Sequence, residues 1–234
     1  MLKILKVKSR FLVAIIFVFS FYIGQSQHRW ENWNRFSIQH QWSTQWSTDA
    51  EYQYRIQENL EPGQRGFVNL MQSLRLWTYF TQKKHQIIVV PFSYFNANTL
   101  TEPNDLYVMQ SQREWRWSMG YQWNAQGNGL SFRYLTDYRF FESNNQALRF
   151  RFLMAYGIPI TEKLKVKVVE EWMANSHILK NQSESEQNRL GFILRWEPIL
   201  NLKMETGYLW LHRFHQTATI QENIITFGLQ YQLP

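Results

Sequence analysis

The chain has 234 residues, no cysteine and a formal net charge of +7, and aromatic residues make up 17% of it. The lack of cysteine excludes a disulfide framework, and the length suits a single domain. Four basic residues and no acidic residue fall in the first 26 positions, so the remainder carries 21 − 18 = +3. That small excess argues against nucleic acid as a partner.

Residues 1–26 have the features of a cleavable signal peptide. The four basic residues precede the apolar run from Phe11 to Ile23, and the small residues Gly24 and Ser26 follow it. The apolar run is too short to span a membrane comfortably as a helix. We therefore expect a secreted chain that is cleaved after Ser26.

Alternation of apolar and polar side chains predicts that residues 27–234 form a series of strands in one domain. From Trp46 to Gln57, large or apolar side chains hold one set of alternate positions, and the other set is entirely polar. Successive side chains of a strand point to opposite faces, so each such strand has one apolar and one polar surface. The expected strands are 29–41, 45–57, 66–80, 85–96, 106–123, 129–141, 147–157, 164–174, 187–196, 202–213 and 220–233.

Two all-β architectures use such strands. A soluble barrel or sandwich turns the apolar row into its core, whereas a transmembrane barrel turns it toward lipid. Covering so many aromatic rows in water would need a second, equally apolar sheet. We therefore expect an antiparallel outer-membrane β-barrel of about 10–12 strands, an even number being usual in bacteria. Tryptophans near strand ends would form its interfacial girdles: Trp30, Trp46, Trp77, Trp123, Trp172, Trp196 and Trp210.

The connections between the expected strands alternate in length. Short ones such as 81–84 and 197–201 alternate with longer polar ones at 58–65, 97–105 and 175–186. One end of the structure would thus carry short turns and the other end longer loops, as in outer-membrane barrels.

The C-terminal strand resembles the signal by which the outer-membrane assembly machinery takes its clients. Apolar residues alternate from Ile225 to Leu233, although Leu233 and Pro234 replace the usual final aromatic residue. We expect that machinery and outer-membrane lipid to be the partners of a monomeric barrel.

Four stretches stand out along the chain: W-E-N-W-N-R-F-S-I-Q-H-Q-W at 30–42, A-E-Y-Q-Y-R at 50–55, R-Y-L-T-D-Y-R-F-F at 133–141 and V-V-E-E-W at 168–172. Together they resemble an uncharacterised Gram-negative family, domain of unknown function 2490. The resemblance covers roughly residues 30–233. It implies a small outer-membrane barrel and brings no activity or catalytic residue with it.

The polar rows, turned inward, predict a network of charged side chains in the barrel lumen. Buried charges need partners, and the guanidinium fork suits several carboxylates. We expect the network to fill most of the lumen, so that function lies in the loops, in lipid contact or in a bound partner. The alternatives are a narrow anion-preferring channel and a soluble periplasmic ligand carrier. The expected members are Glu51, Arg55, Arg75, Glu114, Arg116, Arg133, Asp137, Arg139, Arg149, Arg151, Glu171, Arg189, Arg195 and Glu205.

Catalytic constellations are not evident in the sequence. Ser176 and His177 fall in an expected loop with no recognisable nucleophile motif around them, and as adjacent strand residues they would face opposite ways. His212 and His215 alone do not define a metal site. A barrel hydrolase is therefore the function that fits least. We expect no enzyme activity, no cofactor and no metal.

Two charges break the alternation. Arg113 falls on the apolar row of Trp115, and Glu170 falls on the apolar row of Trp172. Either a β-bulge turns each charge inward or the charge lies near the membrane interface, and the sequence leaves both explanations open.

Overall fold

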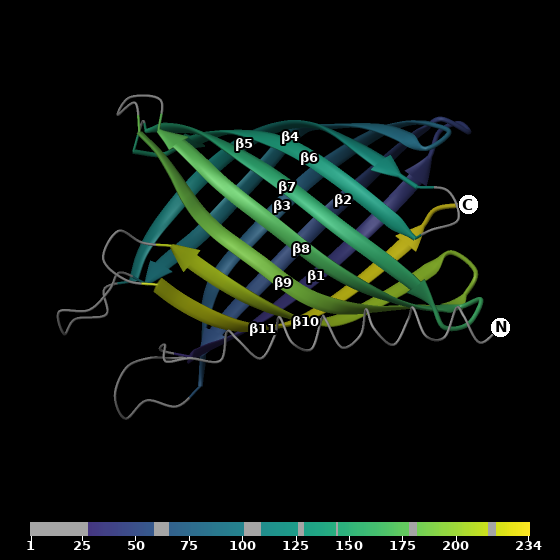
Figure 1. Ribbon diagram of the computed structural model, residues 1–234. Coiled ribbons are helices and arrows are strands. Elements are labelled where there is room, and N and C mark those ends of the chain that lie inside the picture. Colours follow the sequence, from purple (N-terminus) through teal and green to yellow (C-terminus); the bar gives the residue numbers. More distant parts are fainter. Residues whose placement is uncertain are drawn as a thin grey trace.

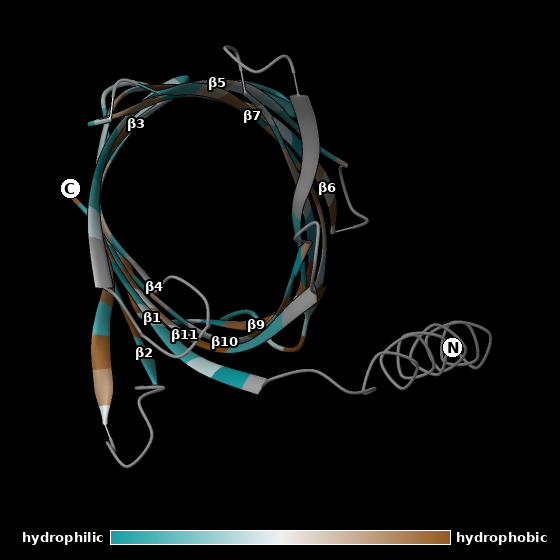
Figure 2. Ribbon diagram, turned by 90° about the vertical axis from the view of Figure 1, so that its left-hand side faces the viewer, coloured by the Kyte–Doolittle hydropathy of each residue, from teal (hydrophilic) through white to brown (hydrophobic). Residues whose placement is uncertain are grey.

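The computed structural model describes residues 28–58, 66–100, 109–125, 129–143, 145–177, 182–214 and 219–234. Within them the chain forms one closed β-barrel, which Figure 2 shows as a ring of strands. The expected all-β fold is confirmed, and each expected strand is present with its ends shifted by a few residues. No helix in these described ranges is long and apolar enough to cross a membrane. The strands are β1 (His28–Gln41), β2 (Trp46–Glu58), β3 (Phe67–Gln82), β4 (His85–Leu100), β5 (Met109–Asn124), β6 (Leu130–Phe141), β7 (Gln146–Pro159), β8 (Leu164–His177), β9 (Gln182–Ile199), β10 (Leu202–Phe214) and β11 (Thr219–Gln232).

The barrel closes with an odd number of strands. Every consecutive pair from β1 to β11 is antiparallel, whereas β11 returns to β1 in parallel. Strand direction alternates around an antiparallel ring, so an odd count leaves two neighbours pointing the same way. The parallel pairing is long, and its register runs from His28 opposite Gln221 to Gln39 opposite Gln232. The even strand number usual in bacterial barrels therefore does not hold for the described chain.

The two ends of the barrel differ. The short connections 42–45, 83–84 and 200–201 lie at one end, together with the C-terminus (Figure 1). We call this the turn end and the opposite one the loop end. The long connection expected at 175–186 is wrong, because β8 and β9 continue into it and His177 pairs with Gln182. Polar composition indicates a loop, but the backbone ladder of two strands can continue whatever their side chains are.

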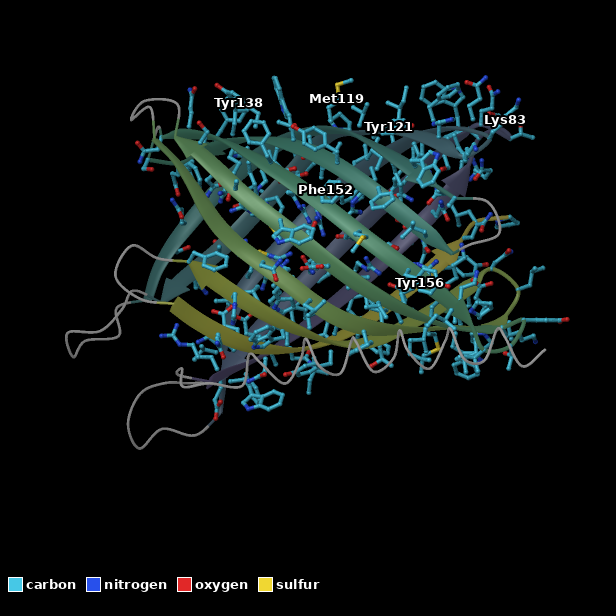
Figure 3. The ribbon with its side chains drawn as sticks, in the orientation of Figure 1. Lys83, Met119, Tyr121, Tyr138, Phe152 and Tyr156 are labelled. Atoms are coloured by element: carbon cyan, nitrogen blue, oxygen red, sulfur yellow. The ribbon has the colours of Figure 1, made fainter. Side chains whose placement is uncertain are left out.

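The outward face of the barrel is apolar around the whole ring. Met119 is 66% exposed and projects from the outer side in Figure 3. A large apolar side chain is likewise exposed on each strand that the structure describes. Examples, one from each strand in order, are Phe36, Tyr52, Leu74, Phe92, Met119, Tyr134, Phe152, Trp172, Leu194, Tyr208 and Ile225.

Trp77 is an exception to the tryptophans expected on the outer face. It points inward, is 6% exposed, and packs with Ile88, Val90 and Leu135. Its position in β3 is two residues from Arg75, so both side chains share the lumen face. Trp77 therefore cannot belong to an outer girdle, and its assignment there is wrong.

Arg113 lies on the outer face toward the loop end of β5. Its Nη1 atom is 3.4 Å from Oε1 of Glu142, and both side chains are more than half exposed. The irregularity between β4 and β5 falls at Val90 and Ser93, toward the other end of the strand. No bulge therefore turns Arg113 inward, and its side chain stays on the outer row of β5.

Glu170 lies near the middle of β8 and also faces outward, between Met154 and Leu190 on the neighbouring strands. The described register shift of β8 and β9 falls at Met173, beyond Glu170, so no bulge turns Glu170 inward. Its Oε1 atom accepts a long hydrogen bond, 3.5 Å, from the side-chain amide of Asn188. Neither explanation offered by the sequence accounts for this residue.

Candidate functional site: the charged lumen

Glu171 on β8 is the acceptor at the centre of one group of lumen ion pairs. Arg151, Arg189 and Arg133 approach it at 2.7, 3.3 and 3.5 Å. Arg189 is directly opposite Glu171 across the β8–β9 ladder, and Arg151 lies on the other neighbouring strand, β7. Asp137 adds a second carboxylate, 3.8 Å from Arg151. One carboxylate thereby receives three guanidinium groups.

Glu114 on β5 organises a second group. Arg116, two residues further along the same strand, donates from Nη2 at 2.9 Å, and Arg139 of β6 donates from Nη2 at 3.0 Å. The side-chain oxygen of Asn175 then accepts from Arg139 at 3.3 Å and from Arg149 at 3.2 Å. The group thus extends across β5, β6, β7 and β8.

Further ion pairs lie elsewhere in the lumen. Glu205 of β10 pairs with Arg195, whose Nε donates at 2.6 Å, and with Arg35 of β1. Glu51 pairs with Arg75, which lies opposite it on β3. Together these groups place all fourteen expected charged residues on inward-facing rows, and twelve of them join the ion pairs described above. The other two are Arg149, which donates to Asn175, and Arg55.

Several lumen residues were not predicted from the sequence. Arg213 of β10 lies 2.9 Å from Glu222 and 3.8 Å from Glu31, and Arg35 pairs with Glu205. Alternation alone could have found Glu31 and Arg35, because both lie on one row of β1. That row also carries Trp33, however, while Asn32 and Asn34 lie on the outward row. This mixture hides which face of β1 is polar.

Arg55 is held differently from the other members. Its guanidinium carbon lies 3.6 Å from the centroid of the Trp33 ring, and its Nη2 donates to Gln53 at 2.9 Å. Among the described residues, no carboxylate forms an ion pair with it. Its Nε atom is buried and has no hydrogen-bond partner there. Arg189 approaches the same Trp33 ring at 4.8 Å. A stacked guanidinium of this kind retains its charge and its fork of donors.

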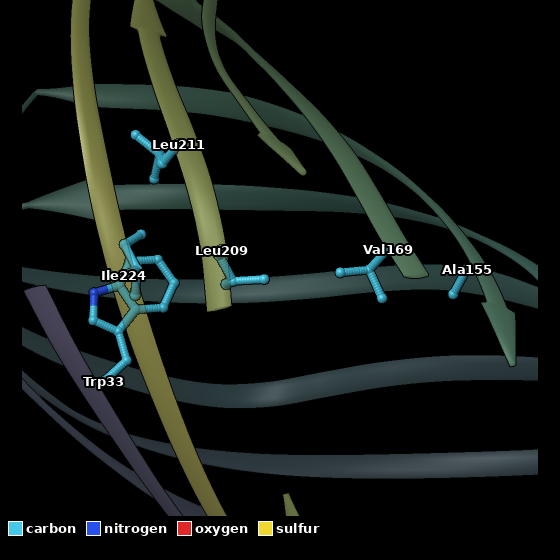
Figure 4. Packing of buried hydrophobic residues seen from close by; sticks show 6 residues of the cluster. All are labelled: Trp33, Ala155, Val169, Leu209, Leu211 and Ile224. Atoms are coloured by element: carbon cyan, nitrogen blue, oxygen red, sulfur yellow. The ribbon is translucent and has the colours of Figure 1, made fainter. Parts of the chain in front are cut away.

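An apolar cluster forms another part of the lumen wall. Its members come from β1 and from β7, β8, β10 and β11, and Figure 4 shows them together. Leu153 and Ile193 are partly buried and pack against the cluster. Apolar side chains thus lie beside a dense set of charges inside one barrel. The cluster consists of Trp33, Ala155, Val169, Leu209, Leu211 and Ile224.

A cavity of about 880 Å³ lies between these groups. Eleven arginines and five glutamates among the described residues line it, an excess of 11 − 5 = 6 cations. Counting the buried acids Glu31, Asp49 and Asp137 as well still leaves three cations more than acids. Because the charged side chains lie along the wall, they fill less of the lumen than the sequence suggests.

The histidines of the sequence analysis lie only partly within the described residues. No group of three or more histidine, aspartate or glutamate side chains there could hold a metal ion. The side chain of His177 and all of His215 lie outside the described residues.

The fold and the lumen define the class of this protein: a closed β-barrel with an apolar outer face and a charged interior. The chain belongs to the family described as protein of unknown function DUF2490, whose model matches residues 30–233. Neither a curated protein nor a solved structure matches the chain.

Proposed function

We propose that the chain is an integral β-barrel of the bacterial outer membrane. The observation that carries the proposal is the apolar outer face, to which every described strand contributes an exposed large side chain. Soluble monomers rarely expose contiguous apolar patches larger than a few hundred Å². In lipid the same face is favourable, and a closed barrel leaves no unpaired sheet edge.

The two outward charges bear on this proposal differently. Arg113 lies four residues from the start of β5, toward the loop end, where a charge costs less than at the bilayer centre, and it pairs with Glu142. Glu170 lies near the middle of its strand, where lipid would oppose an ionised carboxylate, although less strongly than an arginine. Asn188 supplies its one described polar contact. We propose that this region faces the acyl chains with Glu170 as a tolerated polar site.

For the lumen we propose a binding compartment and no catalytic role. The ion-pair groups fix the arginines against the wall, and the cavity between them has the size of a small-molecule site. The arginine excess favours anionic occupants. Outer-membrane lipid and the assembly machinery are the other partners we propose for a monomer.

The second candidate is a narrow anion-preferring channel, which the same arginine excess favours. An eleven-stranded barrel lies between eight-stranded barrels filled by side chains and wide porins. Planar-bilayer recordings separate the candidates. Stable unitary currents that reverse at the anion equilibrium potential would favour the channel, whereas silence would favour the compartment.

The membrane proposal is tested by fractionating cells that express the full chain. We expect the protein in the outer-membrane fraction, with a gel mobility that changes when the sample is boiled, because folded barrels resist denaturation by detergent at room temperature. A protein found in the soluble periplasm, with one mobility under both conditions, would contradict the proposal and favour a soluble ligand carrier.

A further inference from the structure

Arg55 offers a charge that the described protein does not neutralise by an ion pair. The guanidinium lines the cavity, and stacking on Trp33 fixes its position. The arginines that repel its charge, Arg189, Arg75 and Arg116, each pair with a carboxylate, namely Glu171, Glu51 and Glu114. Arg55 is therefore the one of these four arginines that has no ion pair among the described residues. An anion entering the cavity would gain most at this point.

Trp33 contacts both Arg55 and the apolar part of the cavity wall. The Arg55 guanidinium stacks on the Trp33 ring, and Trp33 also belongs to the cluster that contains Leu209 and Val169. Ile193 packs against the same cluster, and all of these side chains line the cavity. A ligand whose acid group met Arg55 would therefore have an apolar surface within the same cavity.

We propose that the lumen cavity binds an amphiphilic anion, which is a carboxylate or phosphate attached to an apolar chain or ring. This inference rests on the proposed lumen compartment and names its ligand class. The acid group accepts hydrogen bonds from Arg55, and the apolar part lies along Leu153, Val169, Ile193 and Leu209. Small hydrophilic anions would contact Arg55 and would leave the apolar wall uncovered. Polar groups that orient a ligand beside an apolar lining are typical of small-molecule sites.

The chemistry fits two sources of ligand. An acid released from membrane lipid and a soluble solute of the same class both carry an anion on an apolar body. The structure specifies the shared chemistry, and the two sources need separate arms of one experiment.

The experiment uses the full chain purified from membranes in a neutral detergent and transferred to nanodiscs of zwitterionic lipid. Calorimetric titration compares hexyl phosphate with inorganic phosphate and with hexylammonium, while organic extracts of the purified protein are analysed for acidic lipids. We expect hexyl phosphate to bind at least about tenfold more tightly than inorganic phosphate, because only it can cover the apolar wall. Hexylammonium should not bind. Empty nanodiscs correct for partition into lipid.

Two variants test the charged part and the apolar part of the site separately. Arg55→Gln should weaken hexyl phosphate and inorganic phosphate alike, by about tenfold or more, because a charge-assisted hydrogen bond is lost. Ile193→Asn should weaken hexyl phosphate by about fivefold and leave inorganic phosphate unchanged. Arg113→Gln, which removes an arginine whose side chain lies on the outer face, across the barrel wall from the cavity, is the matched control and should bind as the unaltered protein does. Heat-dependent gel mobility shows that each variant is folded.

Binding of added hexyl phosphate that both variants weaken supports the inference for a soluble ligand. An acidic lipid that co-purifies with the unaltered protein, and not with folded Arg55→Gln, supports it for a membrane source. Equal affinity for hexyl phosphate and hexylammonium, or folded variants that bind as the Arg113→Gln control does, would overturn it. A barrel that enters the membrane yet binds no anion would refute the ligand and leave the membrane proposal standing. A protein found in the soluble fraction would refute the membrane proposal itself.

Discussion

Replacing Glu171 with alanine should destabilise the barrel by about 3–5 kcal/mol, because breaking a buried ion pair leaves an uncompensated charge. Three arginines, Arg133, Arg151 and Arg189, converge on this carboxylate. Their side chains would then repel one another in a confined, poorly hydrated space. The measurement is the midpoint of urea unfolding in lipid vesicles, followed by gel mobility without boiling.

The matched control for this prediction is Glu142→Ala. Glu142 also pairs with an arginine, Arg113, but both side chains are more than half exposed. Exposed pairs contribute about 0–1 kcal/mol, so this variant should unfold almost as the unaltered protein does. Equal urea midpoints for the two variants would mean that the Glu171 group does not act as a network.

Replacing Val89 with arginine should cost about 2–4 kcal/mol if the outer face meets the acyl chains near the bilayer centre. Val89 is 39% exposed and lies on the outer face of β4, between Thr78 and Met119 on the flanking strands. The same change on a water-exposed surface would alter stability by no more than about 0.5 kcal/mol. Urea unfolding in vesicles measures the difference directly.

Ile199→Arg serves as the control for Val89→Arg. Ile199 is 63% exposed at the end of β9, beside the turn at 200–201. Near the interface an arginine costs about 0–1 kcal/mol. A Val89→Arg barrel as stable as Ile199→Arg would place this part of the outer face in water and contradict the membrane proposal.

The alternation of side chains predicted most of the barrel. It placed the strands of the barrel because a strand has only two faces, and a row such as Glu51, Gln53 and Arg55 has to share one. The family assignment agrees with the model match over residues 30–233. The parallel pairing of β1 with β11 could not be predicted, because pairing between the two ends of a chain leaves no local trace.

The composition of individual rows explains what the sequence missed. Trp77 is inward although tryptophan suggests an interface, and Glu170 is outward although a carboxylate suggests the lumen. For both residues, the position in the alternation of the strand decides which face the side chain occupies, and the hydropathy of the side chain does not. The stacking of Arg55 on Trp33 joins strands β2 and β1. Among the described residues no carboxylate forms an ion pair with Arg55, and only the assembled barrel shows this.

The most direct test of the membrane-spanning barrel compares two adjacent positions on β7. Phe152 is 41% exposed on the outer face, and Leu153 lines the cavity. The chain has no cysteine, so Phe152→Cys and Leu153→Cys each accept one fluorescent bimane label. In vesicles with brominated acyl chains, strong quenching is expected for the label at 152 and little for the label at 153. Absence of quenching at both positions, or equal quenching at both, would contradict a barrel whose alternate residues face lipid and lumen.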